Sequence, residues 1–339
     1  MKIRLIGHSK NPTMTVGTQG PWFEFKKTLE RLENQISTEN FMAQNDCLIA
    51  NTHSKDAILE CEHNKIPVNR RILILWEPNV VVPKVYKKKI LKLYGKVYTP
   101  SVDWSKKVGG EIFQWPQLNL VDYKQNYEDW ESRKNKAVMV LANKFSASRG
   151  EQYSIRRELN LLCADNDTMD LYGAKWNEGI FYNLRHYVGS LLRTPIASID
   201  LRSARLLMKK FSNFQGHSED KFKTISDYAI SIVIENSSDY VSEKLFDSVA
   251  SGAVTIYVGP DLERYGISGE SAIQTKASAK EIFKVVRNLQ SMTVDQQRKI
   301  AKKQYNELLK AAGEWEGNLV LTTLARNINS YLKSTITQQ

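Results

Sequence analysis

A glutamate and a lysine, Glu243 and Lys244, stand side by side where a polar loop changes into a helical pattern. The apolar residues that follow recur at helical spacing, so both side chains fall in the first turn of the expected helix. Backbone N–H groups at such a terminus attract phosphate. The lysine could therefore pair with a phosphate, and the carboxylate could accept hydrogen bonds from ribose hydroxyls. A solvated ion pair at a helix end is the simpler alternative.

The elements that would position this pair lie in the stretch 227–260. Residues 229–234 are a short apolar run with β-branched side chains, which predicts a strand buried on both faces, and residues 235–238 end it with polar turn formers. A helix is expected over about 242–252 and a second strand over 254–258. This order predicts one βαβ unit of a parallel sheet, and ligands bind beyond the carboxyl ends of such strands.

The run IENSSDYVSEKLFDSVASGAVTIYVGP, residues 234–260, resembles the signature of the α-1,3/α-1,4-fucosyltransferases, glycosyltransferase family 10. That signature passes through E-N-S, a short spacer, Y-V-T-E-K, a helix and G-A-V-P-V-hydrophobic-G-P. The chain departs from it with Ser242 in place of Thr, Thr255 in place of Pro and a shorter spacer than in some members. By this resemblance, four residues would hold the nucleotide and the sugar: Asn236, Tyr240, Glu243 and Lys244.

The resemblance also implies a fold, which is α/β of the GT-B type with two facing Rossmann-like domains. Residues 119–136 turn polar and charged, without a strand or a strong helical period, and this predicts an interdomain linker. We expect an N-terminal acceptor-binding domain over residues 1–130 and a C-terminal nucleotide-sugar domain with terminal helices over 131–339. In two-domain transferases of this type, the last helix commonly packs back toward the other half.

By the same resemblance, an arginine after the strand expected at 137–142 binds the donor diphosphate. The arginine fork matches phosphate oxygens and can stabilise the charge of the leaving group. The spacing to the next expected strand favours Arg156 or Arg157, whereas the position in the loop favours Arg149. The choice among the three stays open, with Arg156 and Arg157 ranked first.

A candidate general base, Glu77, follows the strand expected at 71–75 and stands between Trp76 and Pro78. A carboxylate beside these residues is partly desolvated, a setting that suits a base working near neutral pH. In the fucosyltransferases, a glutamate after the equivalent strand is the proposed base. A loop glutamate that only caps the turn is the alternative.

The resemblance implies an inverting, metal-independent transfer of L-fucose from GDP-fucose to a glycan hydroxyl, expected to be O3 of N-acetylglucosamine or glucose. Glu77 would remove the hydroxyl proton, while Lys244 and an arginine would neutralise the departing diphosphate in place of a divalent metal. No cofactor is expected. The alternatives are a transferase of the same fold with another nucleotide sugar and, more distantly, a non-enzymatic basic binding protein.

The formal net charge of +11 calls for an anionic partner. The densest basic segment runs from Lys84 to Lys96, and it predicts either a solvated helix face or a peripheral contact with anionic lipid headgroups, where a lipid-linked glycan could be the acceptor. No recognised nucleic-acid motif accompanies the charge, so nucleic acid is not expected as a partner.

The expected location is the cytoplasm, with the inner membrane face as an option. The sequence has no apolar window long enough to span a bilayer and no signal-peptide pattern. In this respect the chain resembles bacterial or viral members of the family rather than the anchored animal enzymes.

Three scattered cysteines, Cys47, Cys61 and Cys163, fit a reducing compartment. Cys61 with His63 lacks the spacing of a zinc site. The segment 175–217 matches no expected function.

Overall fold

The structure is a computed structural model that describes residues 1–6, 20–38, 45–51, 53–114, 127, 129–194 and 211–337. The chain divides into two compact units. The first contains Met1–Pro78, Lys84–Leu118 and Gly313–Gln339, and the second contains Asn79–Pro83 and Asn119–Ala312. Each unit has its own parallel six-stranded sheet, so the prediction of an α/β protein is confirmed.

The sheet of the second unit has the strand order β12-β11-β10-β7-β8-β9. Its strands are β7 (Lys134–Val140), β8 (Met169–Tyr172), β9 (Phe214–Gly216), β10 (Tyr228–Ile234), β11 (Val254–Val258) and β12 (Ile273–Gln274). The chain moves outward from β7 to β9 and then returns to the other side of β7, where Ile230 of β10 pairs with Ala137. The sheet therefore changes its direction of winding between β7 and β10. Open α/β sheets bind their ligands at such a switch point.

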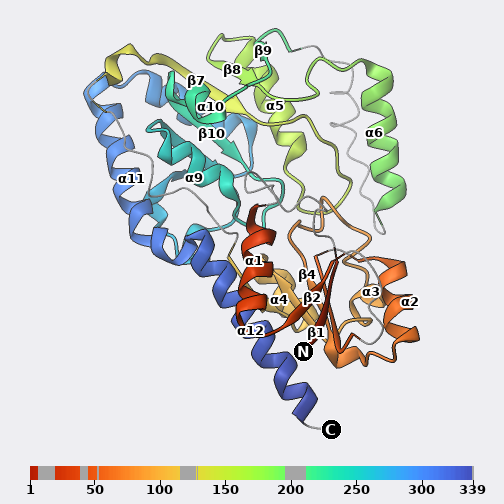
Figure 1. Cartoon of the computed structure of the whole chain (residues 1–339). Helices are drawn as coiled ribbons and strands as arrows, with labels where there is room; N and C mark the ends of the chain where they lie inside the picture. The colour runs from red at the N-terminus through yellow and green to blue at the C-terminus, as the bar shows by residue number, and fades with distance from the viewer. Residues whose placement is uncertain are drawn as a thin grey trace. The chain divides into compact units, whose positions relative to one another are not determined.

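Helices cover both faces of this sheet (Figure 1). Successive side chains of a strand point to opposite faces, and β7 accordingly contributes Met139 to one cluster and Val138 to another. The first cluster includes Leu159 of α5 (Tyr153–Ala164) and Ile282 of α10 (Ala279–Gln290). The second includes Ile225 of α8 (Lys221–Ser226), which lies beside α9 (Glu243–Ala250). Two layers of helices explain why every residue of β10 is buried.

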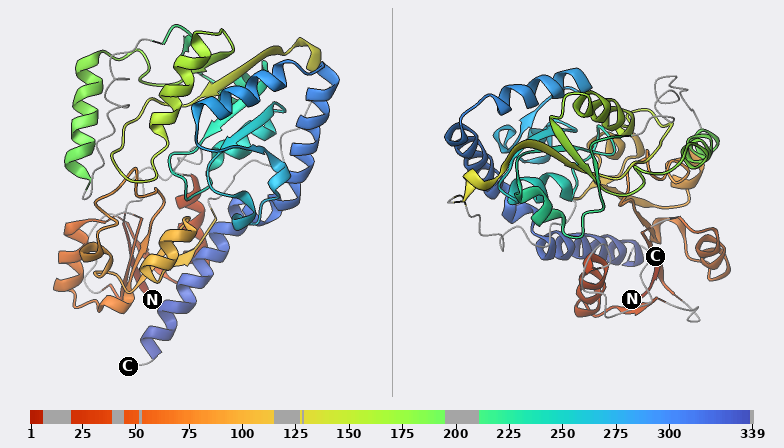
Figure 2. Two further views of the ribbon diagram at one scale, coloured as in Figure 1. Left: turned by 180° about the vertical axis from the view of Figure 1, so that it is seen from behind. Right: turned by 90° about the horizontal axis from the view of Figure 1, so that it is seen from above.

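The sheet of the first unit has the order β2-β1-β3-β4-β5-β6. Its strands are β1 (Lys2–Ile6), β2 (Gln35–Ser37), β3 (Cys47–Ala50), β4 (Arg71–Ile74), β5 (Lys96–Thr99) and β6 (Glu111–Ile112). Its helices are α1 (Gly20–Arg31), α2 (Lys55–His63), α3 (Lys88–Leu91), α4 (Val102–Val108) and α12 (Gly317–Thr337). The remaining long helices are α6 (Ile180–Arg193) in the second unit and α11 (Val294–Trp315), which continues from the second unit into the first (Figure 2).

The helix α12 belongs to the first unit, whereas the expected boundaries, 1–130 and 131–339, assigned it to the second domain. Its apolar residues Leu321, Leu324 and Ile328 recur at helical spacing and share a core cluster with Phe25 and Leu29 of α1. The periodicity of α12 predicts a buried face but does not say which sheet buries it.

The expected βαβ unit within 227–260 is present as β10, α9 and β11. The linker expected at 119–136 is shorter than predicted, because β7 already begins at Lys134 and Trp130 is buried with its indole N–H donating to the carbonyl oxygen of Gly252 at 3.1 Å. Residues 119–126 and 128 of this region, and 195–210 of the unassigned segment 175–217, lie outside the described residues.

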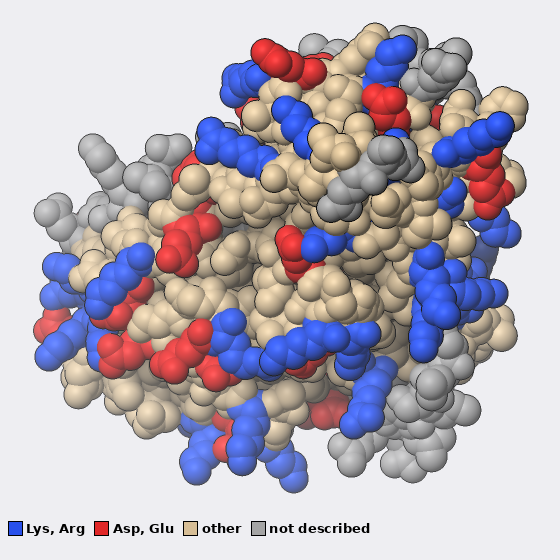
Figure 3. All heavy atoms as spheres, turned by 90° about the horizontal axis from the view of Figure 1, so that it is seen from below, with Lys and Arg blue, Asp and Glu red and all other residues tan. Residues whose placement is uncertain are grey.

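The basic segment from Lys84 to Lys96 forms only one helical turn, α3, so an extended basic helix face is not present there. Lys96 at its end forms an ion pair with Glu111. On the face shown in Figure 3, acidic side chains lie among the basic ones. Among the described helices, none combines the length and the apolar character needed to cross a bilayer.

Candidate functional site

The loops that follow β7 and β10, residues 141–152 and 235–242, are joined to each other at the switch point of the second sheet. The backbone N–H of Ser238 donates to the carbonyl oxygen of Gly150 at 3.1 Å. Gly150 has a φ of +85°, and a Cβ at this position would lie 3.2 Å from the Oγ of Ser238. The left-handed backbone favours glycine where the loops meet.

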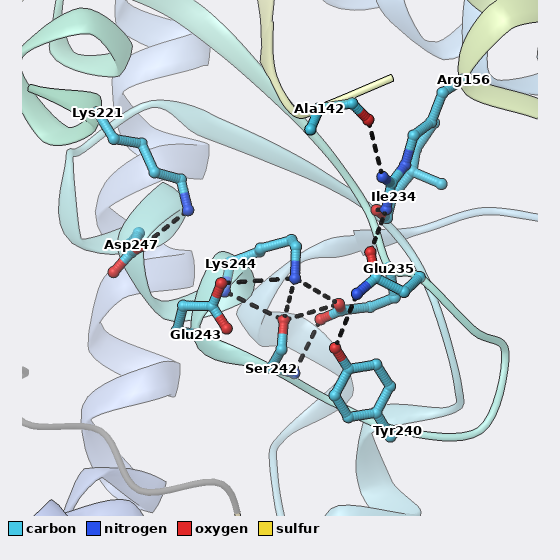
Figure 4. Close-up of polar contacts among 11 residues, drawn as sticks. Ala142, Arg156, Lys221, Ile234, Glu235, Tyr240, Ser242, Glu243, Lys244 and Asp247 are labelled. Atoms are coloured by element: carbon cyan, nitrogen blue, oxygen red, sulfur yellow. Dashed lines mark hydrogen bonds and ion pairs between the residues drawn. The ribbon is translucent and has the colours of Figure 1, made fainter. Parts of the chain in front are cut away.

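Arg156, at the start of α5, ties the two loops together from inside (Figure 4). Its guanidinium donates to the carbonyl oxygen of Ile234 at 2.5 Å, to Oδ1 of Asn236 at 3.0 Å and to the carbonyl oxygen of Ala142 at 3.5 Å. The side chain is buried, and this desolvation lowers the pKa of Arg156 from the ordinary arginine value. Its two terminal nitrogens thus bond to protein acceptors, whereas its buried Nε has no hydrogen-bond partner among the described residues.

The two other candidate arginines differ in exposure. Arg157 is buried, donates to the carbonyl oxygen of Lys144 at 2.7 Å and stacks its guanidinium 4.3 Å from the ring centre of Phe145. Arg149 lies exposed in the turn before Gly150, with no hydrogen bond or ion pair to another described residue. Of the three, Arg149 is the one presented to solvent at this edge of the sheet.

A buried carboxylate, Glu235, anchors the start of α9 (Figure 4). It accepts hydrogen bonds from the backbone N–H of Ser242 at 2.9 Å and from its hydroxyl at 2.7 Å. The ammonium of Lys244 lies 3.4 Å from the same carboxylate and donates to Oγ of Ser242 at 2.8 Å. Ser242 is also the N-cap of α9, since its Oγ accepts from the backbone N–H of Lys244. A buried charge is tolerated only with such partners.

The predicted ligands Asn236 and Tyr240 are turned toward the protein interior. Both side chains are buried, and Nδ2 of Asn236 donates to the hydroxyl of Tyr240 at 3.2 Å, while its Oδ1 accepts from Arg156. In this arrangement they brace the loop after β10.

Glu243 is the solvent-facing member of the group, with its side chain 44% exposed in the first turn of α9. Desolvation acts to raise the pKa of this carboxyl, but the ammonium groups of Lys244 and Lys221 outweigh it, so the pKa lies below the ordinary value. Lys244 lies 3.5 Å from Glu243, and Lys221 pairs with Asp247 at 2.7 Å. An ionised carboxylate at this place can accept hydrogen bonds from hydroxyl groups.

The predicted base Glu77 belongs to the first unit, whereas the other six predicted site residues belong to the second. It follows β4 and is half-buried, and its carbonyl oxygen accepts from the hydroxyl of Tyr86 at 2.8 Å. The ring of Trp76 packs edge-on against Phe113, with centroids 5.1 Å apart, and that of Tyr86 packs against Trp104 at 4.6 Å. Aromatic packing thus fixes the backbone that carries this carboxylate.

Sequence reasoning missed Glu235 and Ser242 as members of the cluster. Their signal was a charged residue directly after the largely apolar run of β10, followed seven positions later by a helix-capping serine. Within the described ranges, no group of three or more His, Cys, Asp and Glu side chains could hold a metal ion. Burial raises the pKa of the Cys61 thiol to about 11, so this cysteine is a protonated core residue at neutral pH.

No protein-family model and no curated protein matches the chain in sequence. Solved structures match its fold. Anabaena HepE in complex with UDP has a TM-score of 0.58 at 13% identity, over 97% of this chain and 100% of that one. A glycosyltransferase from Rickettsia africae has a TM-score of 0.53 at 12% identity, over 98% of each chain. Sucrose-phosphate synthase from Thermosynechococcus elongatus has a TM-score of 0.56 at 10% identity, over 98% of this chain and 99% of that one.

These neighbours are GT-B glycosyltransferases, and the likeness extends over nearly the whole chain. The prediction of a GT-B fold with two Rossmann-like units is therefore confirmed.

Proposed function

We propose that the protein is a glycosyltransferase that moves a sugar from a nucleoside diphosphate to a hydroxyl group of a glycan. The observation that carries this proposal is the polar cluster beyond the carboxyl ends of β7 and β10, at the switch point of a GT-B type unit. The proposal is also supported by the neighbours of the same fold, which include Anabaena HepE in complex with UDP-glucose.

The diphosphate would bind at the first turn of α9. The ammonium of Lys244 and the backbone N–H groups of this turn supply positive charge. Arg149 is exposed in the loop after β7, which is hydrogen-bonded to the loop after β10. Glu243 would accept hydrogen bonds from the ribose. Arg156 would act indirectly, because its donors hold the two loops that carry these groups.

GDP-fucose is the donor we propose first, because residues 234–260 resemble the fucosyltransferase signature, and the expected reaction is inverting and independent of metal. A UDP-hexose is the second candidate, since the structures of Anabaena HepE contain UDP and UDP-glucose. The cluster described above would contact the diphosphate and the ribose, which both donors share.

In the proposed reaction, Glu77 takes the proton of the acceptor hydroxyl as its oxygen forms a bond to the anomeric carbon. The bond from that carbon to the diphosphate oxygen breaks, and the electron pair leaves with the nucleoside diphosphate. Lys244 stabilises this charge, as positioned cations do in other transfers of this kind. The sugar passes through an oxocarbenium-like state, as in glycoside hydrolysis.

A thermal-shift experiment with GDP, UDP, ADP and CMP, each with and without magnesium, tests the donor. A ligand that binds only the folded protein raises the unfolding midpoint according to its affinity and concentration. A rise with GDP alone, without metal, is the expected result. A rise with UDP alone would select the second candidate, and no rise with any nucleotide would contradict the proposed function.

A further inference from the structure

The helix α6 has its polar and apolar faces reversed relative to an ordinary surface helix. Its buried side chains are those of Asn183, Tyr187 and Ser190. Its outer side carries large apolar residues, of which Phe181 is 85% and Leu192 is 83% exposed. Leu184 and Val188 share this exposed side, and Ile180 is exposed at the first position of the helix.

A hydrogen bond and an aromatic contact fix this orientation. The hydroxyl of Ser190 accepts a hydrogen bond from the backbone N–H of Ala147 at 2.7 Å. The ring of Tyr187 lies edge-on to Phe145, with centroids 6.5 Å apart. Because these contacts attach α6 to the loop after β7 by its polar side, the apolar side is left facing outward.

The charge of α6 is entirely basic. Arg185 and Arg193 are exposed, and the helix contains no Asp or Glu. Desolvation, followed by the positive charges of Lys175, Arg193 and Arg185, lowers the pKa of His186, while only Glu178 acts to raise it. The charged side chains near His186 are therefore mostly cationic.

We propose that α6 is a membrane-contact element that inserts Phe181 and Leu192 among the acyl chains of an anionic lipid surface, with Arg185 and Arg193 at the headgroups. An apolar stripe flanked by basic residues is the pattern of helices that lie in a bilayer interface. The helix has 14 residues and therefore presents a face about 21 Å long. This inference does not depend on the proposed catalytic activity.

A lipid surface fits these observations better than a protein partner. The helix α6 lies at the margin of its unit (Figures 1 and 2), and its apolar side chains Phe181 and Leu192 are largely exposed. Partner proteins usually bury their hot spots in pockets. Projecting rings and aliphatic chains need no complementary pocket in order to enter acyl chains.

Co-sedimentation with vesicles of phosphatidylcholine alone or mixed with phosphatidylglycerol tests the proposal. Wild-type protein is expected to bind the anionic vesicles and to bind neutral ones much more weakly. The double substitution Phe181→Ser with Leu192→Ser should lower the partition coefficient about tenfold or more, because it removes most of the inserting area. Leu59→Ser is the matched control, since Leu59 is 62% exposed on α2 in the other unit.

The charged residues are tested separately. Arg185→Gln with Arg193→Gln should weaken binding to the anionic vesicles by about tenfold, because each basic residue near such a surface contributes separately to binding. Lys299→Gln with Lys302→Gln, on exposed positions of α11, changes the net charge equally and should have a much smaller effect.

Insertion itself can be observed with a fluorophore on Leu192→Cys. The native cysteines are buried, and burial raises the pKa of the thiol of Cys47 to about 12 and those of Cys61 and Cys163 to about 11, so labelling near pH 7 is directed to the new thiol. The dye should shift to the blue with anionic vesicles, and a dye on Leu59→Cys should not.

Several results would overturn the proposal. One is the absence of binding to anionic vesicles, and another is a loss of binding that Leu59→Ser reproduces. A dye at position 192 that reports an apolar environment without vesicles would show that another part of the chain covers α6. A wild-type dimer that Phe181→Ser with Leu192→Ser converts to a monomer, without vesicle binding, would assign the face to self-association.

Discussion

The charged residues of the two units differ in their surroundings. In the first unit they follow β4, and in the second they lie in and beside the joined loops after β7 and β10. Glu77 is a half-buried carboxylate on a backbone held by aromatic packing. In the second unit, Lys244 forms an ion pair with the buried Glu235, and the buried Arg156 donates hydrogen bonds to the ends of both loops. Because Glu77 is half exposed, its substitution should act chiefly on the chemistry, whereas a substitution in the second unit should affect both folding and binding.

The largest effect is expected for Glu77→Gln. Loss of a general base lowers turnover by about 10²- to 10⁴-fold, and the affinity for the nucleotide and the unfolding midpoint should stay unchanged. Initial rates with a donor and an acceptor, together with thermal unfolding, provide the measurement. Glu62→Gln, on an exposed position of α2, is the matched control. Near-normal turnover in Glu77→Gln would remove this residue from the reaction.

Lys244→Met should lower both turnover and stability. Turnover should fall by about 10²- to 10³-fold because the leaving diphosphate loses its cation. The free energy of unfolding should fall by about 3 kcal/mol because the buried carboxylate of Glu235 loses its counter-ion. Adding Glu235→Gln should restore most of the stability and none of the turnover. If it restores both, Lys244 acts on the fold and not on the donor.

Arg156→Met should lower the free energy of unfolding by about 2 to 3 kcal/mol, because the buried carbonyl oxygen of Ile234 and Oδ1 of Asn236 lose their donor. Urea unfolding provides the measurement, with Arg287→Met on the exposed side of α10 as the control. A stable Arg156→Met protein that fails to bind nucleotide would instead make this arginine a direct ligand of the diphosphate.

Arg149→Gln should weaken nucleoside diphosphate binding by a factor of about 3 to 10 and leave the unfolding midpoint unchanged, because this arginine is exposed. Calorimetric titration with GDP and UDP gives the dissociation constants. An unchanged dissociation constant would leave Lys244 and the first turn of α9 as the proposed diphosphate site.

The smallest effect concerns Glu243. Its pKa in the folded protein lies below the ordinary value of 4.5, so its ionised form stabilises the fold above that pH, and this contribution is lost as the pH falls through the lower, folded-state pKa. Glu243→Gln should therefore make stability fall less steeply at acidic pH. Urea unfolding at a series of pH values below about 5 tests this, and an unchanged pH dependence would contradict the assigned shift.

The fold was predictable because its main signals are local. The apolar run of β10, the capping pattern at Ser242 and the strand β11 each specify their own structure. The helix between the two strands implies that they are parallel. The apolar stripe of α12 could cover either sheet, so its place in the first unit was expected only from the resemblance to two-domain transferases, whose last helix commonly packs back toward the other half.

The place of the site residues along the chain was predictable, but the direction in which their side chains point was not. The sequence located the loop after β10, yet it could not show that Asn236 and Tyr240 point inward, because a polar residue in a turn has no periodicity to reveal its direction. Arg156 and Arg157 lie on the buried side of α5, whose polar partners come from distant segments. Their partners, and hence the exposure of Arg149, follow only from the tertiary structure.

The most direct test of the proposed activity is a transfer assay in which GDP-fucose and UDP-glucose are each offered with a panel of glycan acceptors, and the products are weighed by mass spectrometry. We predict that one donor alone adds a single sugar to an acceptor, with an equal amount of nucleoside diphosphate released, and that Glu77→Gln lowers the yield of this product by about 10²- to 10⁴-fold. Full product formation by Glu77→Gln, or no transfer from any nucleotide sugar, would contradict it.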